Sequence, residues 1–276
     1  MNDPHTTDHA ASHRRHPLPP PGHVTPADTL RWIAAGWKTF IANPGTWILQ
    51  TLVLIAVLFA LAAAVGFIPT FGPLLAPLVL QLVFPMLVAG MVTGVHAQHR
   101  GEPLRVGHLF EGARRHSGNL LMVGFFYVLG GLAAALVAVL VGSSAAVTGM
   151  LVGLLGSIGL ASGVALLSAA LWPVLLILLL MALWFAPPLV VLQNVSPLDA
   201  MKLSLRACIS NLGSFIVLGF VIYLLTWFAM LPFALGVLVL VPVLAGALYA
   251  AWQDTFAPHA PQPTPTLPAP TAPPAE

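Results

Sequence analysis

Histidines near the N-terminus have the spacing of a metal site. His5, His9 and His13 recur every four residues, so a helix would place them on one face, where imidazoles bind transition metals. The surrounding segment is polar, rich in proline and without an apolar face that could fold against other residues. We therefore expect residues 1–24 to form a disordered tail and predict no metal site there.

A second group of histidines lies where a predicted membrane helix ends. The group consists of His96, His99, His108 and His116. Imidazoles gathered at a membrane interface could bind a metal or titrate against lipid headgroups, because their ordinary pKa is close to neutral. Arg100 and Arg105 share the stretch, so the simpler interpretation is a polar interface segment without metal or cofactor.

No pattern of catalytic residues accompanies these histidines. The predicted membrane spans contain no charged residue, although an ionisable residue inside the membrane is the usual sign of a functional site. The chain also lacks a phosphate-binding glycine loop and a nucleophile elbow. Gln50 and Gln81 are amides within spans, and we expect them to bond neighbouring helices. The sequence thus predicts a protein that is not an enzyme.

The composition requires lipid as the solvent. Hydrophobic residues make up 58% of the 276-residue chain and charged residues 7%, with a mean hydropathy of +0.94. A soluble domain carries about 25% charged residues. Six apolar segments reach the ~20 residues that a membrane helix needs. They are Trp47–Ile68, Leu74–Ala97, Leu120–Val141, Leu166–Leu189, Leu212–Met230 and Phe233–Tyr249. We predict an all-α, polytopic transmembrane bundle of about six spans over residues 25–256, followed by a disordered tail over 257–276.

The basic residues indicate the orientation of these helices. All ten Lys and Arg precede the first span, or lie between spans two and three or spans four and five. Because basic loops stay in the cytoplasm, both termini should be cytoplasmic. The net charge of +2 is too small to suggest a nucleic-acid partner. The residues expected to face anionic headgroups or partners are Arg31, Lys38, Arg114, Arg115, Lys202 and Arg206.

The uncharged segment 142–165 makes the number of spans less certain. It is rich in glycine, and Gly149 and Gly153 form a small-xxx-small pair that permits close helix packing. A seventh span would move Lys202 and Arg206 to the side opposite the other basic stretches. We therefore expect a re-entrant or interfacial segment.

Two helix-start motifs suggest internal repetition. Thr25-Pro26-Ala27-Asp28 and Ser196-Pro197-Leu198-Asp199 each combine a hydroxyl N-cap, a first-turn proline and an acid. The following residues predict amphipathic helices at the interface, with one apolar face each. These faces comprise Leu30, Ile33, Trp37, Phe40 and Ile41, and Leu198, Met201, Leu205, Cys208 and Ile209. Residues 105–116 form a looser third copy. We predict three modules, each an interfacial helix followed by a transmembrane hairpin.

Prolines distinguish the two helices of each predicted hairpin. The second, fourth and sixth spans contain prolines in their interiors, whereas the first, third and fifth do not. Proline removes a helical hydrogen bond and bends the helix. The predicted kinks lie at Pro77, Pro85, Pro173, Pro187, Pro188 and Pro242.

One stretch resembles known bacterial proteins. Trp184-Phe185-Ala186-Pro187-Pro188-Leu189-Val190-Val191, residues 196–204 and Asn211 resemble a signature of bacterial inner-membrane proteins. One such group is the membrane domain that accompanies some glycerophosphodiester phosphodiesterases. The overall sequence is most similar to an uncharacterised family of six-helix proteins, over about residues 25–256. The resemblance implies the inner membrane as the location and provides no catalytic residue.

Two functions fit these features. The first is a membrane scaffold that binds lipids or membrane-protein partners through its interfacial helices. The second is a permease for an apolar or lipid-like substrate, with the proline-containing helices lining the path. Parallel repeats and the lack of a coupling-ion residue favour the scaffold.

Overall fold

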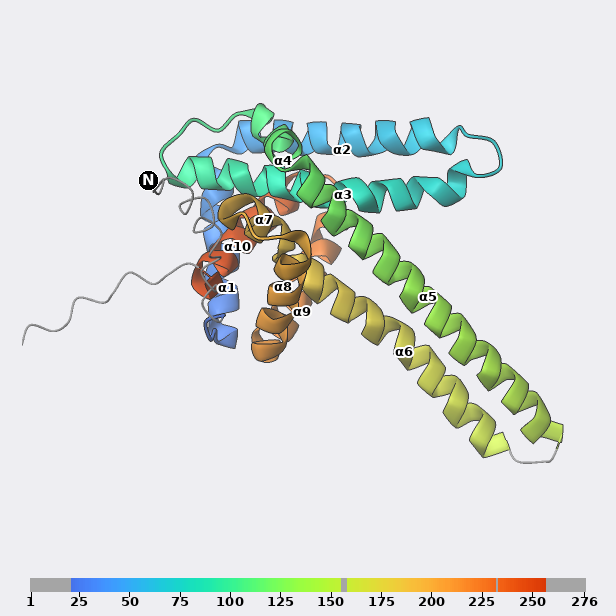
Figure 1. Ribbon diagram of the computed structural model, residues 1–276. Helices are drawn as coiled ribbons and strands as arrows, with labels where there is room; N and C mark the ends of the chain where they lie inside the picture. The colour runs from blue at the N-terminus through green and yellow to red at the C-terminus, as the bar shows by residue number, and fades with distance from the viewer. Residues whose placement is uncertain (1–20, 155–157, 232, 257–276) are drawn as a thin grey trace, which may run out of the picture.

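The protein is a helical, multi-pass membrane protein. A computed structural model describes residues 21–154, 158–231 and 233–256, with the side chains of 142–169 left undescribed. The elements are α1 (Pro26–Ala42), α2 (Pro44–Gly66), α3 (Gly72–His99), the 3-10 helix η1 (Val106–Phe110), α4 (Glu111–Arg115), α5 (Ser117–Leu154), α6 (Ile158–Trp184), α7 (Ala186–Gln193), α8 (Pro197–Ser210), α9 (Leu212–Met230) and α10 (Val237–Phe256) (Figure 1). Within the described residues, six stretches are long and apolar enough to cross a membrane. The predicted all-α, six-span bundle is confirmed.

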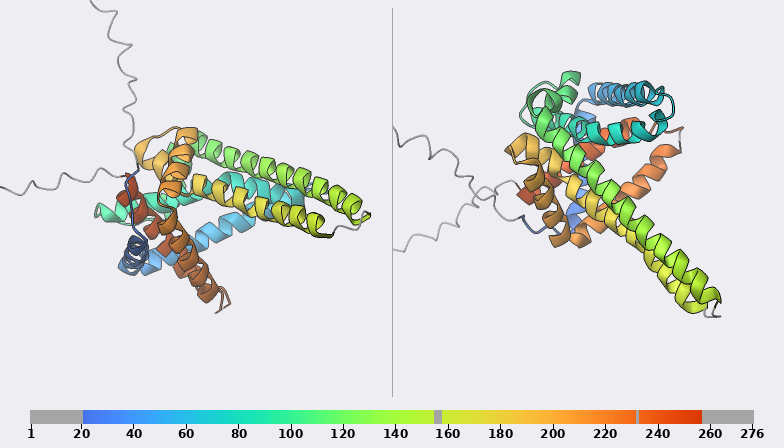
Figure 2. Two further views of the ribbon diagram at one scale, coloured as in Figure 1. Left: turned by 90° about the horizontal axis from the view of Figure 1, so that it is seen from below. Right: turned by 45° about the vertical axis from the view of Figure 1, so that its right-hand side comes forward.

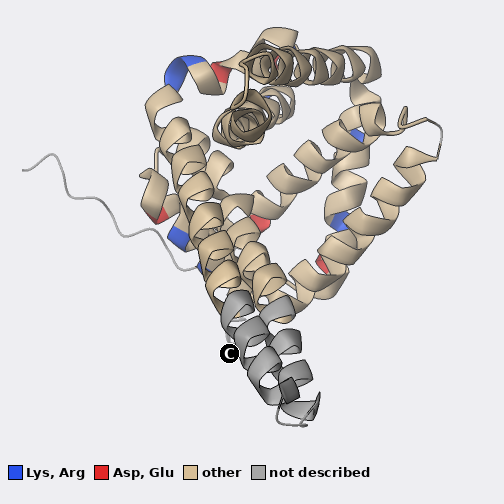
Figure 3. Ribbon diagram, turned by 90° about the vertical axis from the view of Figure 1, so that its right-hand side faces the viewer, with Lys and Arg blue, Asp and Glu red and all other residues tan. Residues whose placement is uncertain are grey.

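Three helical hairpins diverge from a common base (Figures 1 and 2). The hairpins are α2–α3, α5–α6 and α9–α10, and the base contains α1, α4, α7 and α8. Charged segments lie around this base, and the described part of the α5–α6 hairpin has none (Figure 3). The hairpins expose many large apolar side chains, as expected for surfaces in contact with lipid.

The prediction for segment 142–165 is wrong within the described residues. The segment is neither a re-entrant element nor a seventh span, because α5 runs on to Leu154 and α6 begins at Ile158. The 38 residues of α5 extend over about 57 Å, well beyond a hydrocarbon core of about 30 Å. No proline or charge occurs between His116 and Trp172 to end either helix.

The prolines fall in two structural settings. Pro77 and Pro85 lie inside α3, Pro173 inside α6 and Pro242 inside α10. Pro187 and Pro188 instead lie in the first turn of the separate helix α7, so the predicted fourth span is broken at Phe185. A first-turn proline loses no hydrogen bond, because its missing N–H would have no helical partner there.

The two predicted interfacial helices begin where their motifs indicate. The Thr25 N–H donates to the Asp28 carboxylate at 2.8 Å, and Ser196 Oγ accepts from the Asp199 N–H at 3.4 Å. The prediction of one apolar face on each helix is wrong. Both α1 and α8 have one apolar face that is buried in the protein and a second that is exposed. In α1, Trp32 and Phe40 are buried whereas Leu30, Trp37 and Ile41 are exposed; in α8, Met201 and Cys208 are buried whereas Leu198 and Ile209 are exposed.

The N-terminal boundary lies earlier than predicted. The Gly22 N–H donates to Thr255 O at 2.9 Å, and the Val24 N–H donates to Asn211 Oδ1 at 2.9 Å. These bonds hold residues 22–24 between the start of α9 and the end of α10. The remaining predicted tail residues, 1–20 and 257–276, lie outside the described part of the chain.

Each interfacial element packs on the second helix of the preceding hairpin. We call this contact a joint: α4 and η1 lie on α3, α8 lies on α6, and α1 closes the ring on α10. A small residue stands at each joint, seven positions before an asparagine at the start of the next span. These residues are Gly36, Gly112 and Ser204, preceding Asn43, Asn119 and Asn211. The same packing thus occurs three times, as the predicted modules require.

The three joints differ in chemistry. A Cβ atom on Gly36 would lie 2.0 Å from Val243 O, and one on Gly112 would lie 2.9 Å from Met86 O. Ser204 has a side chain and uses it, because its hydroxyl donates to Met181 O at 2.6 Å and accepts from the Phe185 N–H at 2.9 Å. Backbone contact therefore forms two joints, and a bridging hydroxyl forms the third.

Candidate functional site

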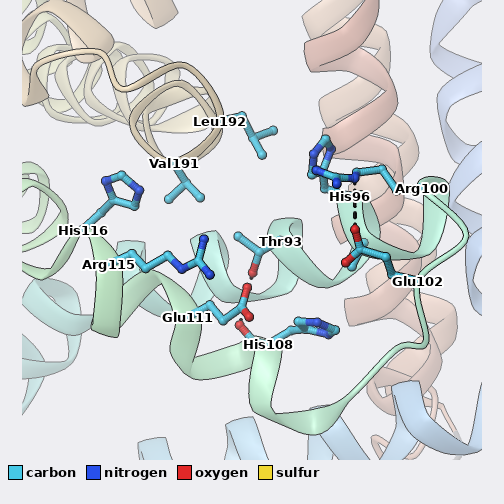
Figure 4. A pocket seen from close by; sticks show the side chains of 11 residues that line it. Thr93, His96, Arg100, Glu102, His108, Glu111, Arg115, His116, Val191 and Leu192 are labelled. Atoms are coloured by element: carbon cyan, nitrogen blue, oxygen red, sulfur yellow. Dashed lines mark hydrogen bonds and ion pairs between the residues drawn. The ribbon is translucent and has the colours of Figure 1, made fainter.

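A polar cavity of about 390 Å³ opens where α3 ends (Figure 4). The last turns of α3, the segment after it, α4 and α7 form its walls. Its ionisable lining residues are His96, Arg100, Glu102, His108, Glu111, Arg115 and His116. We call this cavity the α3–α4 pocket. Three of the four histidines near the end of α3 line it, namely His96, His108 and His116.

The end of α3 is held by an amide clamp. Gln98 Oε1 accepts from Trp47 Nε1 at 3.0 Å, and Gln98 Nε2 donates to Thr39 O at 3.0 Å. Gly101 then adopts a left-handed conformation with φ +76°, which suits glycine. The turn brings Glu102 back over the helix, where it forms an ion pair with Arg100 at 3.0 Å.

The segment after α3 is fastened to the helix by Thr93. Its hydroxyl lies 2.8 Å from Gly90 O and 3.1 Å from His108 O. The Arg105 N–H donates to His108 Nδ1 at 3.1 Å. This bond requires an unprotonated Nδ1, so a neutral His108 carries its proton on Nε2 and can donate it.

The fourth histidine lies apart from the pocket lining. The His99 ring lies 4.9 Å from the Tyr249 ring, and its Nδ1 donates to Val95 O at 3.0 Å. His96 Nδ1 lies 2.9 Å from the Tyr249 hydroxyl and joins α3 to α10. Among the described residues, no three His, Cys, Asp or Glu side chains are placed to hold a metal ion. The arrangement can form hydrogen bonds with a polar ligand.

Arg31 differs from the other basic residues predicted to contact headgroups. Its guanidinium lies 3.1 Å from Asp28 and 2.7 Å from Asp254, and Trp32 Nε1 donates to the same Asp254 oxygen at 2.7 Å. The hydrogen bond and the charge of Asp254 raise the pKa of Arg31. The charge of Arg31 thus connects α1 to α10 and is largely compensated within the protein.

The other five basic residues that were predicted to contact headgroups or partners are exposed on the surface. They form no ion pair with another residue in the described ranges. They are Lys38 on α1, Arg114 and Arg115 on α4, and Lys202 and Arg206 on α8. One or two of them therefore accompany each joint.

Three polar features differ from the sequence-based predictions or are missing from them. Gln50 is fully buried, yet neither atom of its amide has a hydrogen-bond partner among the described residues, so the expected helix–helix bond is absent. The Ser204 bridge and the Asn211 clamp on residues 22–24 were not predicted. The repeated asparagine and the small residue seven positions before it were the available signal.

Comparison of the chain with protein-family models, curated proteins and solved structures finds no match. The resemblance to the six-helix inner-membrane family and to the phosphodiesterase-associated membrane domain stays a prediction. Functional inference therefore depends on the residues and their geometry.

Proposed function

We propose that this protein is a non-enzymatic scaffold of the bacterial inner membrane, which gathers anionic lipids and membrane-protein partners around its interfacial helices. The observation that supports the proposal is the set of exposed cations without ion-pair partners among the described residues, distributed over all three joints. A cation near an anionic membrane surface contributes about 1 kcal/mol to binding.

The surroundings of these cations suit a membrane interface. On α8, Lys202 and Arg206 are one turn apart, and Leu198 and Ile209 expose 47% and 52% of their surface nearby. The apolar side chains can enter the hydrocarbon boundary while the cations remain among the phosphates.

Helix α1 has the same combination of exposed groups. Lys38 lies between Trp37 and Ile41, which are 50% and 52% exposed. Tryptophan is enriched at the level of the headgroups, because its ring is apolar and its N–H is polar. Both helices can thus anchor the protein and concentrate anionic lipid beside it.

The proposal places the base of the molecule in the cytoplasm. All basic residues would then face the leaflet whose anionic lipids attract them. The alternative, a permease for a lipid-like substrate, is supported by an apolar cavity of about 490 Å³ between α1, α9 and α10. Protein-dependent movement of labelled lipid between leaflets would favour that alternative.

The test measures lipid selectivity directly. The full chain is reconstituted, and spin-labelled phosphatidylglycerol and phosphatidylcholine are compared for association with the protein. Wild type should prefer phosphatidylglycerol. The combined variant Lys38→Gln, Arg114→Gln, Lys202→Gln and Arg206→Gln should lose most of this preference, by up to about fivefold for each cation at its own site.

A charge-conserving control separates electrostatics from folding. Lys38→Arg with Lys202→Arg should retain the wild-type preference. Thermal unfolding of each variant in detergent shows whether the fold is intact. An unchanged phosphatidylglycerol preference in the four-Gln variant would contradict the scaffold proposal.

A further inference from the structure

The α3–α4 pocket contains charges of both signs. Two carboxylates, Glu102 and Glu111, share the lining with the guanidinium groups of Arg100 and Arg115. With neutral histidines the formal charge of the lining is zero. The carboxylates would repel a simple anion and the guanidinium groups would repel a simple cation, so a ligand with both charges fits best.

Only two of these four charged side chains form an ion pair with each other. Arg100 and Glu102 compensate each other at 3.0 Å. Glu111 and Arg115 stand one turn apart on α4 and line the same cavity (Figure 4), yet neither forms an ion pair within the described ranges. The Glu111 carboxylate and the Arg115 guanidinium are therefore both available to a ligand.

Neutral groups complete a matching set of donors and acceptors. The Thr93 hydroxyl donates to a backbone carbonyl, so its oxygen can still accept a hydrogen bond. His108 accepts at Nδ1, so its Nε2–H is a donor. Thr93 and Glu111 can thus receive an ammonium, and Arg115 on one side of Glu111 and His108 on the other can each donate to a phosphate oxygen (Figure 4).

The position of the pocket suits a membrane lipid. It lies where the membrane-spanning helix α3 ends, and Val191 and Leu192 of α7 form an apolar part of its wall. Its volume of about 390 Å³ lies within the range of about 300–1,000 Å³ that is common for small-molecule sites. A phosphate ester could bind among the charges while the attached acyl chains contact the apolar wall.

We propose that the α3–α4 pocket binds a phosphoethanolamine group, the headgroup that carries a phosphate ester and a primary ammonium. The inference deepens the proposed lipid-binding function, although it can fail separately. It requires selectivity for one headgroup at one pocket, whereas the scaffold proposal requires only attraction of anionic lipid to the exposed cations.

The experiment compares headgroups on the full chain. Protein in nanodiscs with equal parts of phosphatidylethanolamine, phosphatidylcholine and phosphatidylglycerol is released for native mass spectrometry, and the retained lipids are counted. Wild type should retain phosphatidylethanolamine in preference to phosphatidylcholine, which has the same net charge, whereas retained phosphatidylglycerol reports the attraction of the exposed cations. Glu111→Gln should reduce this preference by roughly tenfold, the effect of one lost hydrogen bond to a charged group. Arg115→Gln should lower the retention of all three lipids at the pocket, because each of them carries a phosphate.

Arg206→Gln is the matched control, because it removes an exposed cation on α8, away from the pocket. It should leave the preference for phosphatidylethanolamine over phosphatidylcholine unchanged. The wild-type comparison with phosphatidylcholine requires no variant, because three methyl groups replace the ammonium hydrogens that Glu111 and Thr93 would accept.

A second arm identifies the source of the ligand. Soluble phosphoethanolamine is titrated calorimetrically into the detergent-purified protein, with inorganic phosphate and ethanolamine as controls. Tight binding of the soluble compound without retention of the lipid would assign the same chemistry to a free metabolite. Retention of the lipid alone would assign it to the membrane.

Three results would overturn the inference. The first is equal retention of all lipids without binding of soluble phosphoethanolamine. The second is a preference for phosphatidylethanolamine over phosphatidylcholine that Glu111→Gln leaves unchanged. The third is retention of phosphatidylglycerol with equal amounts of phosphatidylethanolamine and phosphatidylcholine, which would leave only the attraction of anionic lipid, and with it the scaffold proposal.

Discussion

Gly36 and Ser204 occupy the same position in two modules, seven residues before Asn43 and Asn211, yet they contact their partner helices differently. At Gly36 the backbones of α1 and α10 touch, and Gly246 on α10 leaves room from the other side. At Ser204 the partner helix is interrupted at Phe185, and the serine hydroxyl connects the two sides of the break.

The difference shows how one packing geometry is stabilised in two ways. The α1–α10 joint requires the absence of a side chain, because any Cβ would overlap a carbonyl oxygen. The α8–α6 joint requires a hydroxyl, because the Phe185 N–H would otherwise be unpaired in an apolar setting and Met181 O would keep only the Cys208 thiol as a donor, at 3.6 Å. Substitutions at the two positions should therefore fail for opposite reasons.

The largest expected effect follows from Gly36→Val. A Cβ at 2.0 Å from Val243 O must separate α1 from α10, and overpacking of this kind costs about 3 kcal/mol or more. We expect a strong loss of folded protein, measured as purified yield and thermal unfolding in detergent. Gly219→Val is the control, because a Cβ at Gly219 would meet nothing within 4 Å. Equal loss in both variants would show that the Gly36 contact is unimportant.

Ser204→Ala should have an intermediate effect. It leaves the buried Phe185 N–H unpaired and leaves Met181 O with the weaker Cys208 thiol as its donor, at a cost of about 2 kcal/mol in the free energy of unfolding. The measurement is the midpoint of denaturant unfolding, compared with Ser210→Ala at the exposed end of α8. If Ser204→Ala unfolds at the wild-type midpoint, the hydroxyl bridge does not stabilise the joint.

Cys208 reports on the α8–α6 joint through its reactivity. Burial raises the pKa of its thiol to about 12, so the reactive thiolate is scarce at pH 8. Alkylation of this single cysteine should be slow in wild type and faster in Ser204→Ala, as the joint opens. Labelling at the wild-type rate in Ser204→Ala would indicate that the joint remains closed.

Asp254→Asn should have the smallest effect on stability. It weakens the contact with Arg31, whose side chain is 64% exposed, and an exposed ion pair contributes about 1 kcal/mol or less. Thermal unfolding should show a small decrease, whereas Cys208 alkylation should stay at the wild-type rate because the other joint is intact. Faster alkylation would show that the two joints are coupled.

Local patterns predicted the elements of this fold well. The six spans follow from apolar length, and the starts of α1 and α8 follow from their hydroxyl, proline and acid. The repeated modules were visible because Asn43 and Asn211 follow similar amphipathic stretches. Each of these features depends on residues close together in the sequence.

Long-range contacts explain what the sequence did not predict. Arg31 meets Asp254 across 223 positions, and no local pattern distinguishes a basic residue with a distant acid from one that faces lipid. The same limit applies to the α3–α4 pocket, where Val191 and Leu192 come from α7, far along the chain from α3 and α4. Segment 142–165 was misjudged because its uncharged residues contain no signal that ends a helix.

The proposed scaffold function requires all three interfacial elements to lie on the cytoplasmic side of the membrane. Single cysteines placed in a Cys208→Ala background test this with a membrane-impermeant maleimide applied to intact cells. Cysteines at Phe67 and Phe233, which are 85% and 98% exposed near the hairpin turns, should be labelled. Cysteines at Lys38, Arg114 and Arg206 should be labelled only after the cells are opened. Labelling of any of these three positions in intact cells would contradict the account.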